Sequence, residues 1–237
     1  MKLLVLAGGF GTRLQSVVPA VPKALAPVGN VPFLQLQIEH WKNQGVRSLI
    51  FLLHHHADLI VNFLHEEQEK GLLNDCKVQW LVESSPLDTG GAIAHAVEQL
   101  GLTDNFLVTN ADTWLGACIA SVTQAEAPAV AVVELSDTAR YGRVQFDAQH
   151  NVTGFQEKNT KSQQAGWINA GLCQLNAVSF KDWDYLPFSL ERVIFPAMVE
   201  RRELKAVALQ TEFIDIGVPD DYNRFCRWIA TNRKGTL

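Results

Sequence analysis

Short, continuous apolar runs alternate with longer amphipathic segments through the first half of the chain. The apolar runs, which predict strands, cover residues 3–7, 48–53, 78–82 and 105–109. The amphipathic segments, in which apolar side chains recur near helical spacing, predict helices over residues 33–43, 57–70 and 91–100. Uninterrupted apolar strands are typical of a sheet that is buried on both faces. Strands and helices that alternate in this way predict a parallel sheet with helices on both sides.

The pattern changes after residue 128. Strand-like runs cover residues 129–134, 142–146, 152–156 and 168–175, with little helix between them. Helices return over 190–201 and 220–232, beside strands at 204–209 and 213–216. This order predicts an antiparallel or mixed extension of the first sheet. The expected fold class is α/β, a Rossmann-like mixed, mainly parallel sheet flanked by helices. We expect one domain, residues 1–237, with an N-terminal part (1–128) and a C-terminal part (129–237).

The composition narrows the class of protein. The chain has 237 residues, 47% of them hydrophobic and 19% charged, which is enough apolar material for a large core. Its net charge of -5 argues against a nucleic-acid binder, which usually has a basic face. No apolar run approaches the roughly 20 residues that cross a bilayer, and the N-terminal run ends at Gly8, too early for a signal peptide. We therefore expect a soluble, cytoplasmic protein that binds neither nucleic acid nor membrane.

The four cysteines are far apart in the sequence: Cys76, Cys118, Cys173 and Cys226. None belongs to a CxxC pair, which is the spacing of many metal and redox sites. We expect buried thiols in a reducing compartment.

A glycine-rich segment, Gly8-Gly9-Phe10-Gly11-Thr12-Arg13, directly follows the first predicted strand. Glycines let the main chain turn tightly and bring several N–H groups against an anion, as in loops that bind phosphates. Arg13 ends this segment and Lys23 follows it, so two cations accompany the loop. Neither the GxGxxG spacing of dinucleotide-binding proteins nor the GxxxxGK spacing of a P-loop is present, which argues against an NAD-dependent oxidoreductase.

The glycine-rich segment together with Lys23 resembles the signature of the sugar-1-phosphate nucleotidylyltransferases. Six further segments resemble motifs of the same family, in the family's order: 83–92, 110–112, 141–144, 155–158, 169–171 and 213–217. The resemblance covers nearly the whole chain. It implies the fold of nucleotide-diphospho-sugar transferases. It also implies transfer of a nucleoside monophosphate from its triphosphate to a sugar 1-phosphate, with release of pyrophosphate.

The resemblance also implies roles for individual residues. The attacking phosphate oxygen is already an anion, so this reaction needs cations and aligned phosphates rather than a general base. The expected catalytic residues are Arg13, Lys23 and Asp112. The expected nucleotide-binding residues are Leu6, Ala7, Gly8, Gly9, Gly11, Thr12, Arg13, Lys23, Glu83, Pro86, Thr89 and Gly90. The expected sugar-phosphate-binding residues are Asn110, Gly142, Glu157, Lys158 and Asn169.

Two aspartates are the metal ligands that the resemblance implies. Asp112 follows a predicted buried strand and Asp215 ends another. We therefore expect both at the carboxyl edge of one sheet, where open α/β sheets bind their ligands. Mg²⁺ commonly takes one or two carboxylates together with phosphate oxygens. The expected cofactor is Mg²⁺, with Mn²⁺ as an alternative.

Glu83 bears on the choice of nucleobase. A carboxylate can accept hydrogen bonds from both N1–H and the exocyclic amine of guanine, whereas uracil and thymine offer one donor on that edge. This difference favours GTP. In the alternative, Glu83 faces solvent and the main chain of residues 87–91 recognises the base.

The identity of the sugar rests on two short segments. Residues 14–18 and 188–191 are most similar to the D-glycero-D-manno-heptose 1-phosphate guanylyltransferases within the family, which favours a heptose. Mannose 1-phosphate with GTP, glucose 1-phosphate with dTTP or UTP, and an amino sugar with UTP remain alternatives. So does a non-catalytic regulatory subunit that binds nucleotide sugars. The expected partners are a nucleoside triphosphate and a sugar 1-phosphate, and a homodimer is compatible with the sequence.

Three positions depart from the family's usual residues. Ala111 and Asp88 stand where glycine is common, and Cys173 stands where an aromatic residue is frequent, which would alter the sugar pocket. Ala111 is tolerated unless its position needs a positive φ, and Asp88 adds a negative charge near the nucleotide. The three consecutive histidines at 54–56 point in alternate directions if the chain is extended, so we expect them in a loop or a pocket wall rather than around one metal ion.

Overall fold

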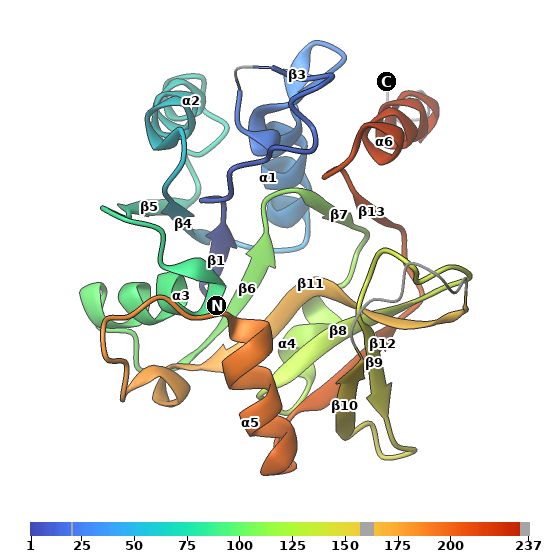
Figure 1. Ribbon diagram of the computed structural model, residues 1–237. Coiled ribbons are helices and arrows are strands. Elements are labelled where there is room, and N and C mark those ends of the chain that lie inside the picture. The colour runs from blue at the N-terminus through green and yellow to red at the C-terminus, as the bar shows by residue number, and fades with distance from the viewer. Residues whose placement is uncertain (20, 157–163, 233–237) are drawn as a thin grey trace.

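The centre of the molecule is a nine-stranded mixed sheet (Figure 1). The computed structural model describes residues 1–19, 21–156 and 164–232. Four neighbouring strands are parallel, in the order β6 (Asn105–Asn110), β1 (Leu3–Leu6), β4 (Ser48–Leu53) and β5 (Lys77–Val82). They correspond to the four apolar runs of the N-terminal half, so this prediction is confirmed.

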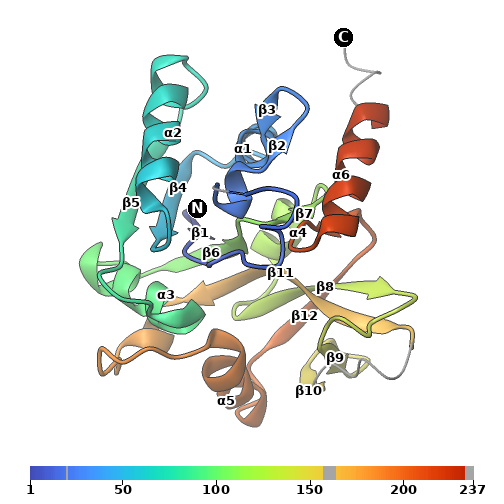
Figure 2. The ribbon, with the colours of Figure 1, turned by 45° about the horizontal axis from the view of Figure 1, so that its top comes forward.

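Helices cover both faces of the parallel strands (Figures 1 and 2). The helices on one face are α1 (Phe33–Asn43), α2 (Ala57–Glu69) and α4 (Ile119–Gln124). Those on the other are α3 (Asp88–Gln99), η2 (Ala177–Phe180), η3 (Leu190–Ile194) and α5 (Phe195–Glu200). Because side chains alternate along a strand, Leu3 and Val5 of β1 are fully buried on the first face and Leu4 on the second.

The C-terminal half extends this sheet. Its strands are β8 (Ala129–Leu135), β9 (Arg143–Phe146), β10 (Val152–Gln156), β11 (Gly166–Asn176) and β12 (Lys205–Leu209). β11 runs antiparallel to β6, β8 and β9, whereas β12 runs parallel to β8. The expected mixed extension and the α/β fold class are therefore confirmed.

A two-stranded ribbon lies outside the main sheet. It pairs β7 (Thr113–Leu115) with β13 (Phe213–Asp215) in antiparallel orientation. Asp112 lies in the turn between β6 and β7, whereas Asp215 ends β13. The expectation that both aspartates lie at the edge of one sheet is therefore wrong for Asp215. The ribbon still brings the two segments together, because the amide of Ile216 donates to the carbonyl oxygen of Asp112 (2.9 Å).

The ribbon is held by a third hydrophobic core. This core includes side chains of α6 (Pro219–Asn232) and of the hairpin formed by β2 (Pro27–Val28) and β3 (Val31–Pro32). The ring of Trp114 in β7 lies 5.3 Å from that of Phe225 in α6, centroid to centroid. The packing of α6 thus supports the segment that carries Asp215.

Two helices differ from their predicted bounds by more than one residue. The helix predicted over 91–100 begins at Asp88, and the one predicted over 190–201 is the π-helical η3 followed by α5. The sequence pattern does not predict the short elements, because so few residues carry too little periodicity. These elements are η1 (Lys23–Leu25), β2, β3, β7, α4 and η2.

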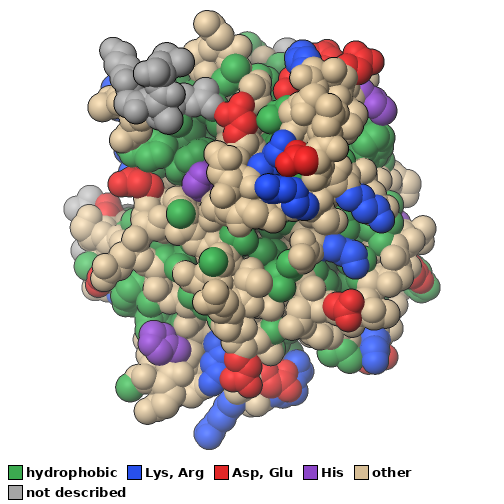
Figure 3. All heavy atoms as spheres, turned by 180° about the vertical axis from the view of Figure 1, so that it is seen from behind, with side chains coloured by type: hydrophobic (Ala, Val, Ile, Leu, Met, Phe, Trp, Pro, Cys, Tyr) green, Lys and Arg blue, Asp and Glu red, His purple; other side chains and the backbone are tan. Residues whose placement is uncertain are grey.

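The cysteines, the helices and the surface can also be compared with the expectations from the sequence. All four cysteines are free thiols, and Cys118 and Cys173 are buried as expected, but Cys76 and Cys226 are only half-buried. None of the helices that the structure describes is long and apolar enough to span a membrane. On the face shown in Figure 3, basic side chains are scattered among acidic ones.

Candidate functional site

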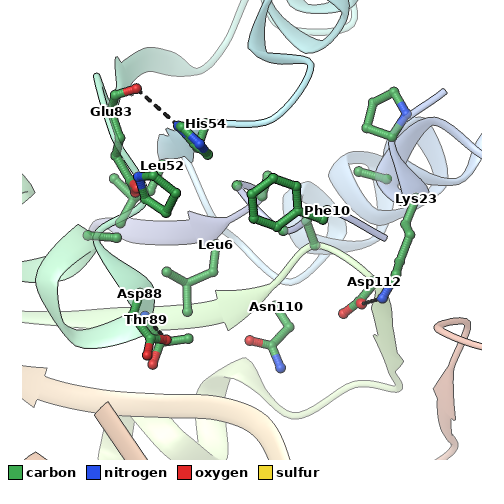
Figure 4. Close-up of a pocket in the computed structure, with 18 residues that line it drawn as sticks. Leu6, Phe10, Lys23, Leu52, His54, Glu83, Asp88, Thr89, Asn110 and Asp112 are labelled. Atoms are coloured by element: carbon green, nitrogen blue, oxygen red, sulfur yellow. Dashed lines mark hydrogen bonds and ion pairs between the residues drawn. The ribbon is translucent and has the colours of Figure 1, made fainter. Parts of the chain in front are cut away.

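A pocket of about 570 Å³ opens at the carboxyl ends of the four parallel strands (Figure 4). Along this edge, Asp112 follows β6, the glycine-rich segment follows β1, His54 follows β4 and Glu83 follows β5. The order of these groups is set by the order of the strands. A cavity of this size is typical of a small-molecule site.

The glycine-rich segment lies close to its neighbours on both sides. A Cβ at Gly8 would lie 3.2 Å from the Cβ and the main-chain nitrogen of His54. Gly11 has a φ of +65°, which favours glycine, and a Cβ there would lie 2.9 Å from Cγ of Lys23. Larger residues at these two positions would push the segment away from the pocket.

Lys23 forms an ion pair with Asp112. Its Nζ lies 3.0 Å from Oδ2 of Asp112, and the two side chains are only 17% and 30% exposed. A Cβ at Gly217 would lie 3.3 Å from the same Nζ and 2.7 Å from Oδ1 of Asp215. The ammonium of Lys23 is therefore close to both expected metal ligands.

Asp215 lies in a partly buried, negatively charged environment. Burial raises the pKa of its carboxyl group, and the charge of Asp112 raises it further. The amide of Gly217, 2.7 Å from Oδ1, lowers the pKa, as do Lys23 and Arg140. Arg140 lies 3.8 Å from Oδ2 and also pairs with an aspartate of α6. Arg140 was not among the residues expected at the site, although it directly precedes the motif at 141–144.

These carboxylates fit a divalent cation that also binds a ligand's phosphates. Among the described residues, no group of three or more His, Cys, Asp or Glu side chains could hold a metal by itself. Asp112 and Asp215 provide two carboxylates, with the positive charges of Lys23 and Arg140 beside them. Mg²⁺ is commonly bound by one or two carboxylates and the phosphates of a substrate.

Glu83 lines the opposite end of the pocket and is only 9% exposed. The alternative in which Glu83 faces solvent is therefore wrong. Its Oε2 accepts a hydrogen bond from the amide of Leu87 (2.9 Å). Burial raises the pKa of the carboxyl group and Asp88 adds to the rise, while the Leu87 amide and the charge of His54 oppose it.

The main chain of residues 87–91 is largely occupied by contacts within the protein. The amides of Gly90 and Gly91 donate to the carbonyl oxygen of Phe188 (2.9 and 3.1 Å), and the amide of Leu87 donates to Glu83. A Cβ at Gly90 would lie 2.2 Å from the Phe188 ring, so only glycine fits there. Phe188 therefore holds in place the main chain of Gly90 and Gly91, which follows Glu83 at this end of the pocket.

Thr89 is also tied to this support. Its hydroxyl donates to Oε2 of Glu191 (2.7 Å) and accepts from the amide of Leu190 (2.9 Å). Its own amide donates to Oδ1 of Asp88 (2.7 Å). Hydrogen bonds of Thr89 thus join the first turn of α3 to η3, although the two segments lie about a hundred residues apart in the chain.

Asn110 and Asn169, which are expected to bind the sugar phosphate, lie near the point where the pairing of β11 with its neighbouring strands changes. The pairing of β11 with β8 is irregular between Asn169 and Cys173. Gly171 has a φ of +77°, and a Cβ there would lie 2.7 Å from Nδ2 of Asn110. Oδ1 of Asn169 accepts from the Gly171 amide (2.9 Å), which holds this bend beside Asn110.

The structure brings many, but not all, of the expected residues to the pocket. Those that line it are Leu6, Ala7, Gly8, Gly9, Lys23, Glu83, Pro86, Thr89, Asn110 and Asp112. Those described but not lining it are Gly11, Thr12, Arg13, Gly90, Gly142, Asn169 and Asp215. Arg13 is exposed, and Glu157 and Lys158 lie outside the described residues. Lining residues that the analysis did not assign include Phe10, Leu52 and Ala92, apolar positions whose local sequence carries no signal of chemistry.

The departures from the family's pattern have local explanations. Ala111 does not have a positive φ, so it causes no strain there. Asp88 has a φ of +59°, which explains why glycine is common at this position and why the short Asp side chain is accepted. Cys173 packs into the core on the α3 face and does not line the pocket, and its effect on the sugar site stays a prediction. His54 lines the pocket wall, as expected.

Comparisons of sequence identify relatives along nearly the whole chain. Residues 2–231 match the nucleotidyl transferase family. The chain is 32% identical to D-glycero-alpha-D-manno-heptose 1-phosphate guanylyltransferase of Campylobacter jejuni, over 95% of this chain and 98% of that protein. It is 31% identical to mannose-1-phosphate guanyltransferase of Hypocrea jecorina, over 100% of this chain but 66% of that protein.

Comparisons with solved structures identify proteins of the same kind as the sequence comparisons do. HddC from Yersinia pseudotuberculosis superposes with a TM-score of 0.81 and 32% identity, over 96% of this chain and 99% of HddC. Its complex with GMP-PN gives a TM-score of 0.80 over the same shares. UDP-glucose pyrophosphorylase complexed with UDP-glucose has a TM-score of 0.80 at 16% identity, over 98% of this chain and 99% of that one, which shows the shared fold alone.

Proposed function

Because the chain belongs to the nucleotidyl transferase family, we propose that it transfers GMP from GTP to D-glycero-D-manno-heptose 1-phosphate and releases pyrophosphate. The observation that carries this proposal is the arrangement along one sheet edge: a carboxylate for a metal, a glycine-rich segment for phosphates, and a buried carboxylate at the far end. The similarity to a heptose enzyme over nearly its full length supports the choice of sugar.

The reaction needs alignment and neutralisation of charge. An oxygen of the sugar phosphate attacks the α-phosphorus of GTP, the bond from that phosphorus to the bridging oxygen breaks, and pyrophosphate leaves. The nucleophile is already an anion, so no residue has to remove a proton from it. The protein instead holds two highly charged groups in line and stabilises the charge on the transferred phosphate.

We assign the phosphates to the glycine-rich end of the pocket. The main-chain amides from Gly8 to Thr12 bind the triphosphate, with Leu6 and Ala7 forming the wall beside them. Lys23 binds the α-phosphate. Arg13, exposed in the protein without ligand, binds the outer phosphates, which extend beyond the pocket.

Asp112 and Asp215 would hold Mg²⁺ together with phosphate oxygens. The bound cation supplies Lewis acidity and neutralises charge on the phosphates. Before a nucleotide binds, Lys23 provides positive charge beside both carboxylates. Lys23 then exchanges its carboxylate partner for the α-phosphate.

Glu83 is the residue that we assign to the guanine base. Only Oε2 has a hydrogen-bond partner among the described residues, which leaves Oε1 available to the base. The amides of residues 87, 89, 90 and 91 have acceptors within the protein, and that of Asp88 has none among the described residues, which narrows the alternative of main-chain recognition to Asp88. Pro86 and Thr89 line this end of the pocket, and Gly90 packs against Phe188 behind it, so we assign them to its shape rather than to donation to the base.

The sugar phosphate is assigned to the side of the pocket nearest β11. Asn110 lines the pocket there, and Asn169 holds the bend beside it. Gly142 precedes Arg143, which pairs with Ile168 beside that bend, and a Cβ at Gly142 would lie 3.1 Å from the carbonyl oxygen of Gln156. Glu157 and Lys158 complete the proposed site for the hydroxyls and the phosphate.

A homodimer and a cytoplasmic location stay predictions.

A panel of substrates tests the proposal. GTP, ATP, UTP and dTTP are each combined with heptose, mannose and glucose 1-phosphates, and pyrophosphate release is measured. We expect the highest kcat/KM for GTP with the heptose. The highest value for another pair would replace the substrates but keep the reaction. GTP binding in calorimetry without turnover of any pair would favour the non-catalytic alternative.

The metal ligand is tested with a matched pair of variants. Asp112→Asn should abolish metal-dependent turnover and leave the melting temperature close to that of the wild type. Asp104→Asn is the control, because Asp104 is exposed and directly precedes β6, at the opposite end of the strand from Asp112. An active Asp112→Asn variant would remove Asp112 from the metal site.

A further inference from the structure

We propose that Gln37 and His40 of α1 are positioning residues for the metal, because they hold the ribbon of β7 and β13 from its free edge. This inference rests on the proposed function, which assigns Asp112 and Asp215 to the metal. Gln37 is 1% exposed, and its Nε2 donates to the carbonyl oxygen of Thr113 (2.9 Å), the residue that directly follows Asp112. None of the described residues that line the pocket comes from α1, so these two side chains act on the site only through the main chain.

Thr113 and Asp215 lie opposite each other in this ribbon. The neighbouring hydrogen bond between its strands runs from the amide of Ile216 to the carbonyl oxygen of Asp112 (2.9 Å). In an antiparallel ribbon this pattern makes Thr113 and Asp215 a pair that is not hydrogen-bonded, so their own carbonyl groups point outward. The outward carbonyl group of Thr113 is the one that accepts from Gln37. Gln37 therefore holds the ribbon from outside at the level of both aspartates.

His40, three residues further along α1, holds the same edge of β7. Its Nε2 lies 3.0 Å from the carbonyl oxygen of Leu115, and its ring stacks on that of Trp114 with centroids 4.5 Å apart. A carbonyl oxygen only accepts, so Nε2 donates, and it can do so in the neutral ring as well as in the charged one. Positions three residues apart share one face of a helix, and alternate residues of a strand point to the same edge. The two donors of α1 therefore match two outward carbonyl groups of β7.

The start of α1 is joined to the segment that carries Lys23. The amide of Phe33, the first residue of α1, donates to the carbonyl oxygen of Ala26, which directly follows η1 (2.9 Å). Lys23, the first residue of η1, pairs with Asp112. One helix thus contacts both sides of this ion pair. A shift of the whole helix would move both partners together, whereas loss of Gln37 alone would let the aspartate move relative to the lysine.

The distance between the two carboxylates depends on the main chain on both sides of the ribbon. A metal site tolerates displacements of only a few tenths of an ångström in its ligands. The pairing of β7 with β13 fixes the inner edge of β7, and Gln37 and His40 fix the outer one. Removal of a group that orients a metal ligand commonly lowers metal affinity or activity by about 10- to 100-fold. We therefore expect loss of the donor at Gln37 to weaken the binding of a cation.

Gln44, at the end of α1, provides a matched control. Its Oε1 accepts from the amides of Cys118 and Ile119 (2.8 and 3.0 Å), at the start of α4. This contact joins α1 to a helix that carries none of the residues assigned to the site. Gln37→Met and Gln44→Met therefore remove the same amide group, one beside the proposed metal ligands and one away from them. Methionine has nearly the length of glutamine, and Oε1 of Gln37 has no hydrogen-bond partner among the described residues, so Gln37→Met removes only the donor.

Two readouts separate positioning from a purely structural role. The first is Mn²⁺ binding to the folded protein without nucleotide, measured by electron paramagnetic resonance. We expect Gln37→Met to bind Mn²⁺ about tenfold more weakly than the wild type, and Gln44→Met to bind it as the wild type does. The second is pyrophosphate release from GTP and the heptose 1-phosphate at saturating Mg²⁺. We expect kcat of Gln37→Met to fall about tenfold while KM for GTP changes less than about threefold, because the base and the triphosphate are assigned to segments that follow β1 and β5.

Each outcome decides a separate point. Unchanged Mn²⁺ binding in Gln37→Met, or an equal loss in Gln44→Met, would overturn the positioning role. Wild-type protein that binds no Mn²⁺ would overturn the metal site and this role with it. Wild-type protein that binds Mn²⁺ but releases pyrophosphate from no pair of substrates would overturn the proposed function and leave the positioning role standing.

A second variant decides the result if Gln37→Met does not fold. His40→Phe keeps a ring that can stack on Trp114 and loses the donor to Leu115. We expect this variant to bind Mn²⁺ more weakly than Gln44→Met does. Equal Mn²⁺ binding in the two variants would overturn the proposal.

Discussion

The ammonium of Lys23 lies 3.0 Å from Oδ2 of Asp112, so a residue assigned to the phosphates is bound to a residue assigned to the metal. The charge of Lys23 also lowers the pKa of Asp215, which burial and Asp112 raise. In the protein without ligand, one lysine thus partly balances two carboxylates. In the function that we propose, a cation and the phosphates replace this internal pair when the substrates bind.

Removing the lysine should separate its two effects. In Lys23→Met we expect kcat/KM to fall by about 100-fold or more, because a cation beside the transferred phosphate is lost. We expect Mn²⁺ to bind the nucleotide-free variant more tightly than the wild type, because no positive charge competes for the carboxylates. Calorimetry with Mn²⁺ measures the second effect. Lys181→Met, at an exposed position, is the control, and unchanged Mn²⁺ binding in Lys23→Met would show that Lys23 does not compete with the metal.

Glu83 should make the unliganded protein less stable as the pH rises. Burial raises the pKa of its carboxyl group above the ordinary value of 4.5, so the folded state holds the proton more tightly than the unfolded state. The stability that this group contributes is complete below the unfolded pKa and is lost as the pH rises through the folded pKa. We therefore expect Glu83→Gln, which keeps the acceptor for Leu87, to melt at a higher temperature than the wild type at pH 7.

The dependence on pH identifies the cause. The stabilisation by Glu83→Gln should shrink as the pH is lowered toward 4, where the wild-type carboxyl group also becomes neutral. Thermal unfolding at several pH values measures it, with Glu69→Gln on the exposed side of α2 as the control. A stabilisation that is the same at all pH values would show that it does not arise from the charge of Glu83.

Gly171 should be required both for stability and for the position of Asn110. Gly171→Ala puts a Cβ 2.7 Å from Nδ2 of Asn110, at a φ of +77°. We expect a loss of about 1–3 kcal/mol in the free energy of unfolding and a lower kcat/KM, because Asn110 must move. Chemical denaturation and pyrophosphate release measure the two effects.

A second glycine provides the matched control. Gly29 also has a positive φ, +62°, but a Cβ there would meet nothing within 4 Å. Gly29→Ala should therefore lose stability through the backbone alone and keep its turnover. If both variants lost turnover to the same degree, the contact with Asn110 would not be the reason.

The position of the site could be predicted because its main components are local in the chain. β1 is an apolar run that ends where the glycines begin, and a loop after a parallel strand lies at the carboxyl edge of its sheet. The aspartate after β6 that we assign to the metal follows the same rule. The bounds of β4 and α1 agree with the pattern of apolar positions, because burial on both faces or on one stripe leaves its period in the sequence.

Contacts between distant segments could not be predicted from such periods. The pattern does not show that Asp215 lies on a separate ribbon, because the pairing of β7 with β13 joins segments about a hundred residues apart, each too short to signal its partner. Nor does it show that Arg140 approaches Asp215, or that the ring of Phe188 fills the space that Gly90 leaves open.

The sequence by itself therefore determined the class of fold, the family, and the types of chemical group at the site, since these depend on residue type and on neighbours along the chain. Only the tertiary structure decided that Glu83 is buried, that His54 lies beside it, and that Lys23 is paired with Asp112. Burial and charge pairing depend on which strands lie next to each other. That order arises when the whole sheet assembles, and no single segment contains it.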